Sequence, residues 1–365
     1  MKRHTPHHYV LILIIALLPC IGLAELPVKV AIDNQLLQYS GRRDDSKPGE
    51  VRFGYSGARV AMAFTGQSVG MYMDSTRSNW VDIYVDGNRL SKIEVSGTGS
   101  YYDLASGLSG TLHRVEVIRA TECNMPITSF KGFALPTGAR VEKWPEPVTR
   151  RIEFIGDSIT CGYGIEVNDA KLHFKPETEN FCDTYAWIAA RNLKADYLVV
   201  ARSGIGMVRN YNGPYEGNED NMPNLYPVLF NQERTKLWDS SKFIPDVVCI
   251  NLGTNDFSTT GVNRAKYEQS YTAFVTRLIS QYPKARIVML LGPMQNSKEL
   301  KEILTRIADS LNAEHGKKVT VFEMSKAGSH GFGADYHPSQ EQAKVNGAEL
   351  TGFLSDLMQW PIQDR

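Results

Sequence analysis

Hydrophobic positions between residues 26 and 135 mostly alternate with polar ones, which is the period of a β-strand. Short alternating runs occupy residues 51–55, 69–73, 81–85 and 113–118, and turn-forming residues separate them. Asp86-Gly87-Asn88, directly after the third run, is typical of a tight hairpin turn. We therefore expect residues 25–137 to form an all-β sandwich of the jelly-roll type.

The pattern changes near residue 150, where apolar runs begin to alternate with stretches of helical period. Strands are expected at 152–155, 197–200, 247–252, 286–291 and 319–322, and helices at 184–193, 267–281, 297–315 and 339–358. Strands alternating with helices predict a parallel sheet covered by helices on both faces. Residues 150–365 are thus expected to form a three-layer α/β/α domain, joined to the first domain by a linker at 138–149.

Charge narrows the choice of partner. The 365 residues include 40 Lys and Arg and 40 Asp and Glu, so the formal net charge is zero. Proteins that bind nucleic acids usually carry a basic excess or a basic stripe, and no nucleic-acid partner is expected here. A small or uncharged partner fits better, and we expect a monomer.

The N-terminus has the layout of a secretory signal. Lys2 and Arg3 precede the apolar run 9–18, and Gly22-Leu23-Ala24 offers a cleavage site after Ala24. The run is too short to span a bilayer comfortably, so no integral membrane association is expected. The predicted location is secreted or periplasmic, with a mature charge near −2. An uncleaved anchor and lipidation of Cys20 are the alternatives.

Four cysteines remain after such cleavage: Cys123, Cys161, Cys182 and Cys249. An oxidising compartment permits a Cys161–Cys182 bridge, while Cys249 lies in an apolar run and is expected to be a buried thiol. The sequence has no pair of cysteines two residues apart and no close cluster of histidine and cysteine. No metal site is therefore expected.

Candidate catalytic residues follow the expected strands. Ser158 comes directly after the first strand of the second domain, and Gly204 and Asn255 follow the next two. Ligands bind beyond the carboxyl ends of strands in such sheets, so these groups are expected to meet there. His337, before the last helix, is the favoured base, and His330 is the alternative. A serine nucleophile needs such a base and donors for the oxyanion, although Ser158 alone is equally typical of a helix cap and Asn255 of a turn.

The ordered motifs resemble those of the SGNH or GDSL-like hydrolases. They are Gly156-Asp157-Ser158-Ile159-Thr160, Ser203-Gly204, Gly253-Thr254-Asn255-Asp256 and Asp335-Tyr336-His337-Pro338. The resemblance implies that Ser158 is the nucleophile and His337 the base, with the Ser158 N–H, the Gly204 N–H and the Asn255 amide as oxyanion donors. It implies no cofactor.

With the preceding β domain, the chain resembles carbohydrate esterase family 2, the acetyl xylan esterase-like deacetylases of plant polysaccharides. The resemblance implies a secreted serine esterase whose partner is an acetylated polysaccharide or oligosaccharide. Asp335 stands one residue closer to His337 than the usual Asp-x-x-His spacing. Both a triad with Asp335 and a dyad in which a backbone carbonyl orients His337 stay open.

Substrate contacts are expected from a polar, aromatic segment at 210–226 that follows the Ser203-Gly204 turn. Aromatic rings stack on sugar faces, and polar side chains bond hydroxyl groups. Tyr211, Tyr336 and Asp157 are the candidate substrate-binding residues. Two other functions stay open: a lysophospholipase or thioesterase acting on longer acyl chains, and a non-catalytic carbohydrate-binding protein.

Overall fold

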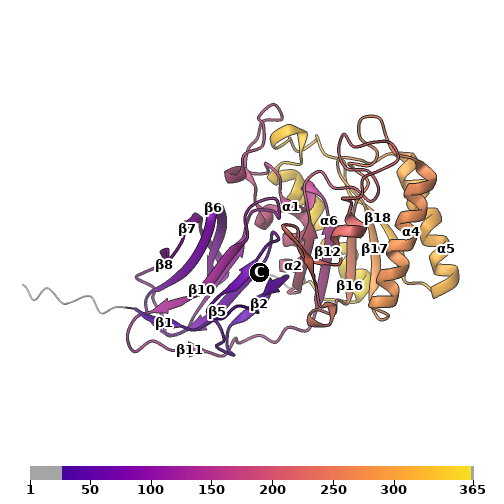
Figure 1. Ribbon diagram of the computed structural model, residues 1–365. Coiled ribbons are helices and arrows are strands. Elements are labelled where there is room, and N and C mark those ends of the chain that lie inside the picture. The colour runs from indigo at the N-terminus through magenta and orange to yellow at the C-terminus, as the bar shows by residue number, and fades with distance from the viewer. Residues whose placement is uncertain (1–26, 363–365) are drawn as a thin grey trace, which may run out of the picture.

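The computed structural model describes residues 27–362 and consists of a β domain followed by an α/β domain (Figure 1). The predicted signal segment, its cleavage site and Cys20 lie outside the described residues. Within 27–362, no helix combines the length and the apolar character that crossing a membrane requires.

The first domain is a curled antiparallel sheet, shown in indigo and purple in Figure 1. Its long central strand β6 (Val69–Val85) pairs with β7, β8, β9 and β10, so the sheet folds round on itself over a core that includes Phe64, Met71 and Phe133. The other strands are β1 (Val28–Val30), β2 (Gln38–Ser40), β3 (Arg43–Asp44), β4 (Val51–Phe53), β5 (Arg59–Phe64), β7 (Asn88–Gly97), β8 (Tyr101–Ala105), β9 (His113–Arg119), β10 (Thr128–Leu135) and β11 (Val141–Glu142).

The predicted hairpin turn is present between β6 and β7. Val85 pairs with Asn88, which leaves Asp86 and Gly87 as a two-residue loop. Both residues have positive φ, 51° and 85°, as a two-residue turn of the type that matches strand twist requires. The predicted linker differs from the structure at its start, because β11 lies within 138–149 and pairs with β5.

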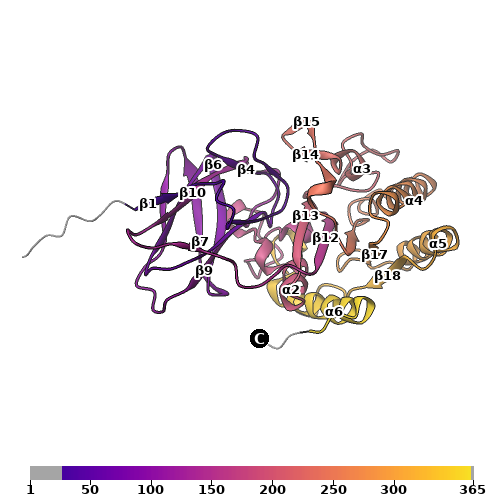
Figure 2. The same cartoon turned by 90° about the horizontal axis from the view of Figure 1, so that it is seen from below.

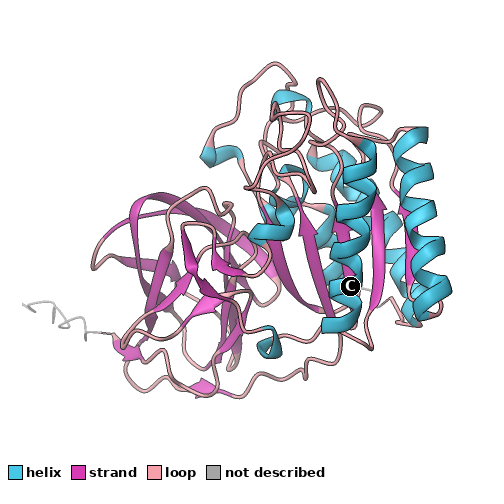
Figure 3. Ribbon diagram, turned by 45° about the vertical axis from the view of Figure 1, so that its right-hand side comes forward, coloured by secondary structure: helices cyan, strands magenta, loops and turns pink. Residues whose placement is uncertain are grey.

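The second domain has the predicted parallel sheet with helices packed against it (Figure 3). The strand order is β13-β12-β16-β17-β18. These strands are β12 (Arg151–Gly156), β13 (Asp196–Ala201), β16 (Val247–Asn251), β17 (Arg286–Leu291) and β18 (Val319–Glu323). Helices α2 (Tyr185–Asn192) and α6 (Gln340–Met358) cover one face, and α4 (Arg264–Gln281) and α5 (Lys298–His315) cover the other (Figure 2). Strands β12, β13, β16 and β17 are almost wholly buried because both faces are covered, whereas the edge strand β18 is only partly buried.

Shorter elements complete the domain. They are α1 (Ser158–Cys161), α3 (Met222–Leu225), the hairpin β14 (Val228–Phe230) and β15 (Glu233–Leu237), and 3₁₀ turns at Pro176–Thr178, Phe181–Asp183, Ser240–Lys242 and Ala334–Tyr336. The Cys161–Cys182 bridge that the sequence permitted is not formed. Both thiols are buried and free, as are those of Cys123 and Cys249.

The two domains meet over a buried interface around Arg42. The Arg42 guanidinium, fully buried, donates from Nη1 to the carbonyls of Tyr226 and Val228, each at 2.6 Å. It also lies against the rings of Tyr226 and Trp238. An arginine of the β domain therefore satisfies main-chain acceptors of the α/β domain.

Candidate active site

Ser158 lies at a sharp turn between β12 and α1. Asp157 is the N-cap of α1, and its Oδ1 accepts the Ile159 N–H at 3.0 Å. A Cβ at Gly156 would lie 2.1 Å from Oγ1 of Thr160, so only glycine fits the end of the strand. The turn places the Ser158 hydroxyl at the carboxyl edge of the sheet, where the sequence predicted it.

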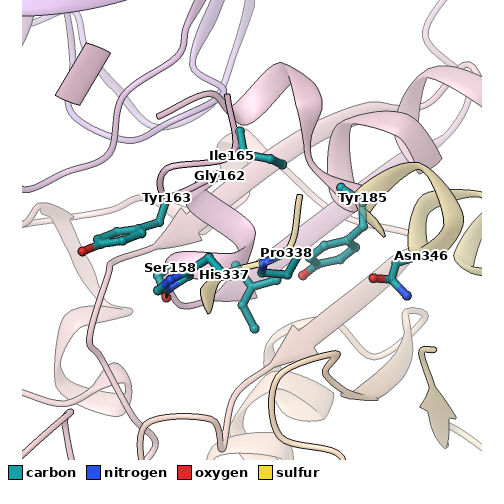
Figure 4. Close-up of a pocket in the computed structure, with 10 residues that line it drawn as sticks. Ser158, Gly162, Tyr163, Ile165, Tyr185, His337, Pro338 and Asn346 are labelled. Atoms are coloured by element: carbon teal, nitrogen blue, oxygen red, sulfur yellow. Dashed lines mark hydrogen bonds between the residues drawn. The ribbon is translucent and has the colours of Figure 1, made fainter. Parts of the chain in front are cut away.

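The structure brings Ser158 and His337 together (Figure 4). Nε2 of His337 lies 2.8 Å from Oγ of Ser158. Nδ1 of His337 lies 3.2 Å from two main-chain carbonyl oxygens, those of Ala334 and Asp335. Since carbonyls only accept, Nδ1 carries the proton and Nε2 is left to accept the serine hydroxyl.

The loop before His337 has an unusual backbone. Asp335 and Tyr336 both have positive φ, 49° and 62°, which costs energy for residues with a side chain. The His337 N–H donates to the Ala334 carbonyl at 3.0 Å and closes this turn. This left-handed pair lets two successive carbonyls approach the same imidazole nitrogen.

The Asp335 carboxylate does not take the position of a third catalytic group. Its oxygens accept from the Tyr163 hydroxyl at 2.9 Å and from the Phe174 N–H at 3.0 Å, and one lies 2.8 Å from Nδ1 of His173. Its contact with His337 is through the main-chain carbonyl. Of the two readings left open by the sequence, this geometry corresponds to the dyad. The shortened spacing turns the Asp335 side chain away from the imidazole.

Two stacked aromatic rings support the imidazole from one side. Tyr163 stacks on His337 with ring centroids 4.2 Å apart, and Phe174 stacks on Tyr163 with ring centroids 4.2 Å apart. Asp335 fixes the Tyr163 hydroxyl in this stack. The packing removes water from the imidazole, and this desolvation lowers the pKa of His337 to about 4.

The predicted oxyanion donors follow the two strands beside β12. Gly204, with φ of 78°, lies in a turn after β13, and its carbonyl accepts the Tyr211 N–H at 2.8 Å. The Asn255 amide, after β16, donates one hydrogen to the Ile205 carbonyl at 2.8 Å and keeps the second for another acceptor. The Asp256 carboxylate accepts from three consecutive amides, those of residues 207–209, and so ties the two turns together.

Two of the predicted substrate-binding residues are exposed and one is not. The side chains of Tyr211 and Tyr336 are 57% and 58% exposed, and Tyr336 packs edge-on against Phe332. Asp157 is fully buried and occupied as the cap of α1, which contradicts the prediction that it contacts substrate. Burial raises the pKa of its carboxyl to about 7. The alternative base, His330, is exposed, and its carbonyl accepts the Ser339 hydroxyl.

A pocket beside the catalytic pair is lined by Ser158, Gly162, Tyr163, Ile165, Tyr185 and His337, among others (Figure 4). Most of its wall is apolar. Potential metal ligands gather elsewhere: side-chain atoms of Glu122, Cys161 and Glu179 lie within 4.8 Å of one another, all buried.

Sequence reasoning missed Tyr163, Phe174 and His173. Tyr163 stands between two glycines, five residues after Ser158, and that tight flank was the available signal. Nothing local marks His173 and Phe174, because their partner Asp335 is more than 160 residues away along the chain.

Two family models match the chain. Residues 39–145 match the model of the carbohydrate esterase 2 N-terminal domain, and residues 154–344 match the GDSL-like lipase/acylhydrolase family. The boundary between the matches falls close to the boundary between the two observed domains.

Curated relatives span both domains. The cellulase/esterase CelE of Acetivibrio thermocellus is 36% identical over 333 residues, which is 90% of this chain and 40% of CelE. An acetylxylan esterase/glucomannan deacetylase of Cellvibrio japonicus is 30% identical over 311 residues, which is 80% of this chain and 82% of that protein.

Solved structures agree along nearly the whole length. A family two carbohydrate esterase from Clostridium thermocellum, in complex with cellohexaose, has a TM-score of 0.85 at 34% identity and covers 89% of this chain and all of that one. A family two carbohydrate esterase from Cellvibrio japonicus has a TM-score of 0.81 at 26% identity, covering 91% and 98% of the two chains. With the two-domain architecture, these matches show that the chain belongs to carbohydrate esterase family 2 and that its second domain is a GDSL-like hydrolase.

Proposed function

We propose that this esterase removes O-acetyl groups from plant-type polysaccharides or oligosaccharides through an acyl-enzyme. The observation that carries the proposal is the 2.8 Å contact between Nε2 of His337 and Oγ of Ser158, with Nδ1 held by two carbonyls. The relatives from Cellvibrio japonicus, called acetylxylan esterase/glucomannan deacetylase, supply the substrate class.

In the first half of the reaction, Oγ of Ser158 attacks the acetyl carbonyl carbon while its proton passes to Nε2 of His337. The N–H groups of Ser158 and Gly204 and the Asn255 amide hold the oxyanion. The carbon–oxygen bond to the sugar then breaks, and the sugar oxygen takes the proton from His337. In the second half, His337 accepts a proton from water, whose oxygen attacks the acyl carbon. The bond from that carbon to Oγ of Ser158 then breaks, Oγ takes the proton from His337, and acetic acid leaves as acetate after losing its proton to solvent.

Aromatic exposure supports a saccharide as the other half of the substrate. Tyr336 adjoins the base, and Tyr211 follows the oxyanion turn, and both rings are open to solvent. Exposed rings at these two places suit stacking on sugar faces.

Acetate release tests the proposal. We expect the protein to release acetate from acetylated xylan and glucomannan, and to hydrolyse 4-nitrophenyl acetate faster than the octanoate. We expect Ser158→Ala to abolish both reactions while binding of the polysaccharide persists. Preference for the octanoate would favour a lysophospholipase or thioesterase, and unchanged function in Ser158→Ala would favour a binding protein.

We also propose that the protein is exported, on the basis of the charged, apolar and small-residue regions within residues 1–24. N-terminal sequencing of the mature protein is expected to begin at Glu25. A mature chain that retains Met1 would contradict export with cleavage of the signal. A lipid on Cys20 would show instead that the protein is anchored to a membrane.

A further inference from the structure

A loop of the β domain reaches the oxyanion turn of the hydrolase domain. It connects β9 to β10 and carries Glu122, whose Oε2 accepts the Ser203 N–H at 2.7 Å. Ser203 directly precedes Gly204, the proposed oxyanion donor. The neighbouring Cys123 thiol approaches the Ala201 carbonyl, at the end of β13, to 3.3 Å. The loop therefore contacts the chain on the N-terminal side of the oxyanion turn at two points.

Buried contacts hold this loop in place. The Arg119 guanidinium donates to the carbonyls of Thr121 at 2.9 Å and of Glu122 at 3.0 Å. The Thr121 hydroxyl donates to the Asn79 amide oxygen at 2.8 Å. Arg119, Thr121 and Glu122 are at most 2% exposed, so water competes little for these bonds. Glu122 is therefore a fixed acceptor and not a mobile surface carboxylate.

Glu122 faces a second buried carboxyl, that of Glu179. Oε2 of Glu179 accepts the Glu122 N–H at 2.9 Å, and its Oε1 has no hydrogen-bond partner among the described residues. Burial raises the pKa of both carboxyls, and their mutual repulsion raises that of Glu179 further. Such a pair holds one proton more readily than two charges. Oε2 of Glu122 already accepts hydrogen bonds from Ser203 and Asn124. We therefore interpret Glu122 as a hydrogen-bond acceptor and not as a ligand of a cation.

We infer that Glu122 is a positioning residue for the oxyanion hole, through which the β domain takes part in catalysis. The inference rests on the proposed esterase function. By accepting the Ser203 N–H, Glu122 fixes the Arg202–Ser203 peptide. The next peptide carries the Gly204 N–H, so the contact restrains the direction of that N–H through the adjoining peptide. That N–H is needed most when charge develops on the oxygen, so its misplacement affects kcat more than KM.

Two variants of Glu122 and one inhibitor test this role, with 4-nitrophenyl acetate as substrate. Glu122→Ala removes the acceptor and is expected to lower kcat about 10- to 100-fold, with KM within about threefold of the parent. Glu122→Gln keeps an oxygen for the Ser203 N–H and is expected to restore kcat to within about threefold. Phenylboronic acid adds to the nucleophilic serine as a tetrahedral anion. Its binding affinity is expected to fall in parallel with kcat across the variants.

Glu116→Ala is the matched control, because Glu116 is also a buried carboxylate of the β domain that reaches the hydrolase domain, through Arg191 on α2 at 2.9 Å. We expect Glu116→Ala to lower the melting temperature and leave kcat unchanged. The inference is overturned if Glu122→Ala retains the kcat of Glu116→Ala, or if its loss lies in KM alone.

A folded Glu122→Gln with less than about a tenth of the parental kcat would also overturn the inference, and this variant decides if Glu122→Ala does not fold. An inactive parent protein would instead refute the proposed function, and the inference with it. The two failures are therefore distinguishable.

Discussion

His337 obtains its orientation from main-chain carbonyls, and this sets its chemistry. A carboxylate on Nδ1 would stabilise the imidazolium by charge, whereas two carbonyls at 3.2 Å supply only dipoles. Stacking against Tyr163 removes water from the ring as well. The neutral imidazole is thereby favoured, which is the form that accepts the Ser158 proton.

The first prediction concerns the pH dependence of the reaction. Desolvation lowers the pKa of His337 to about 4, so the ring is neutral, and active as a base, at all pH values well above 4. We expect kcat/KM for 4-nitrophenyl acetate to stay level from pH 8 down to about 5 and to fall as pH drops through about 4. A decline centred near 6.5, the ordinary histidine pKa, would contradict it.

The second prediction concerns Asp335. Asn at this position tolerates the left-handed backbone and leaves both carbonyls on Nδ1 of His337 unchanged. We therefore expect Asp335→Asn to keep kcat/KM within about tenfold of the parent. Loss of the orienting acid of a triad costs about 10⁴-fold in kcat, and a loss of that size would contradict the dyad. Tyr163→Phe, which removes the hydrogen bond to the same carboxylate, is the matched control.

At the scale of elements, α2 and α6 pack closely through Gly347. A Cβ at Gly347 would lie 2.6 Å from Cγ2 of Ile188 on α2, whereas a Cβ at Gly352, five residues further along α6, would meet nothing within 4 Å. Both glycines thus lie within the same helix, but only Gly347 packs against a neighbouring helix. The α6 helix also follows His337 directly in the chain, so its placement bears on the base.

The third prediction compares alanine at these two glycines. Gly347→Ala must separate the helices, and we expect the free energy of unfolding to fall by about 1–3 kcal/mol. Gly352→Ala is expected to raise it by up to about 1 kcal/mol, because alanine favours the helix. Denaturant unfolding of both variants measures the difference. Equal stabilities would show that the helices can move apart without cost.

Features of this molecule that depend on residues close together in the sequence could be predicted, and those that depend on residues far apart in the sequence could not. Period alone identified the five parallel strands and four long helices, since each extends over enough residues to show its pattern. The two-residue strand β11 and the short hairpin β14–β15 carry no such pattern. The motifs pointed to Ser158 and His337, but the contacts of Glu122 and of the Asp335 carboxylate depend on segments that only the folded chain brings together.

At the scale of the whole molecule, the β domain and the hydrolase domain share buried polar contacts. Besides its two carbonyl acceptors, Arg42 lies 4.0 Å from the Glu153 carboxylate, on the interior strand β12. Burial raises the pKa of Glu153 to about 7 in spite of this cation. Removal of Arg42 would take this donor from two buried main-chain carbonyls and the neighbouring cation from Glu153.

The fourth prediction concerns this interface. We expect Arg42→Ala to lower the free energy of unfolding by about 3–5 kcal/mol, because it breaks a buried ionic contact from one side. Arg140→Ala, which removes a largely exposed arginine paired with Glu142, is expected to change it by less than about 1 kcal/mol. Urea unfolding of both variants provides the measurement, and a similar loss in both would contradict the role of Arg42.

The four buried thiols have a practical consequence for producing the protein. Cys123, Cys161, Cys182 and Cys249 are unpaired in the folded chain, so the described residues acquire their structure without any oxidation step. Burial also raises the pKa of each thiol, which keeps the sulfur in its unreactive, protonated form. Production in a reducing bacterial cytoplasm, and storage with dithiothreitol, should therefore yield the same enzyme as passage through an oxidising compartment.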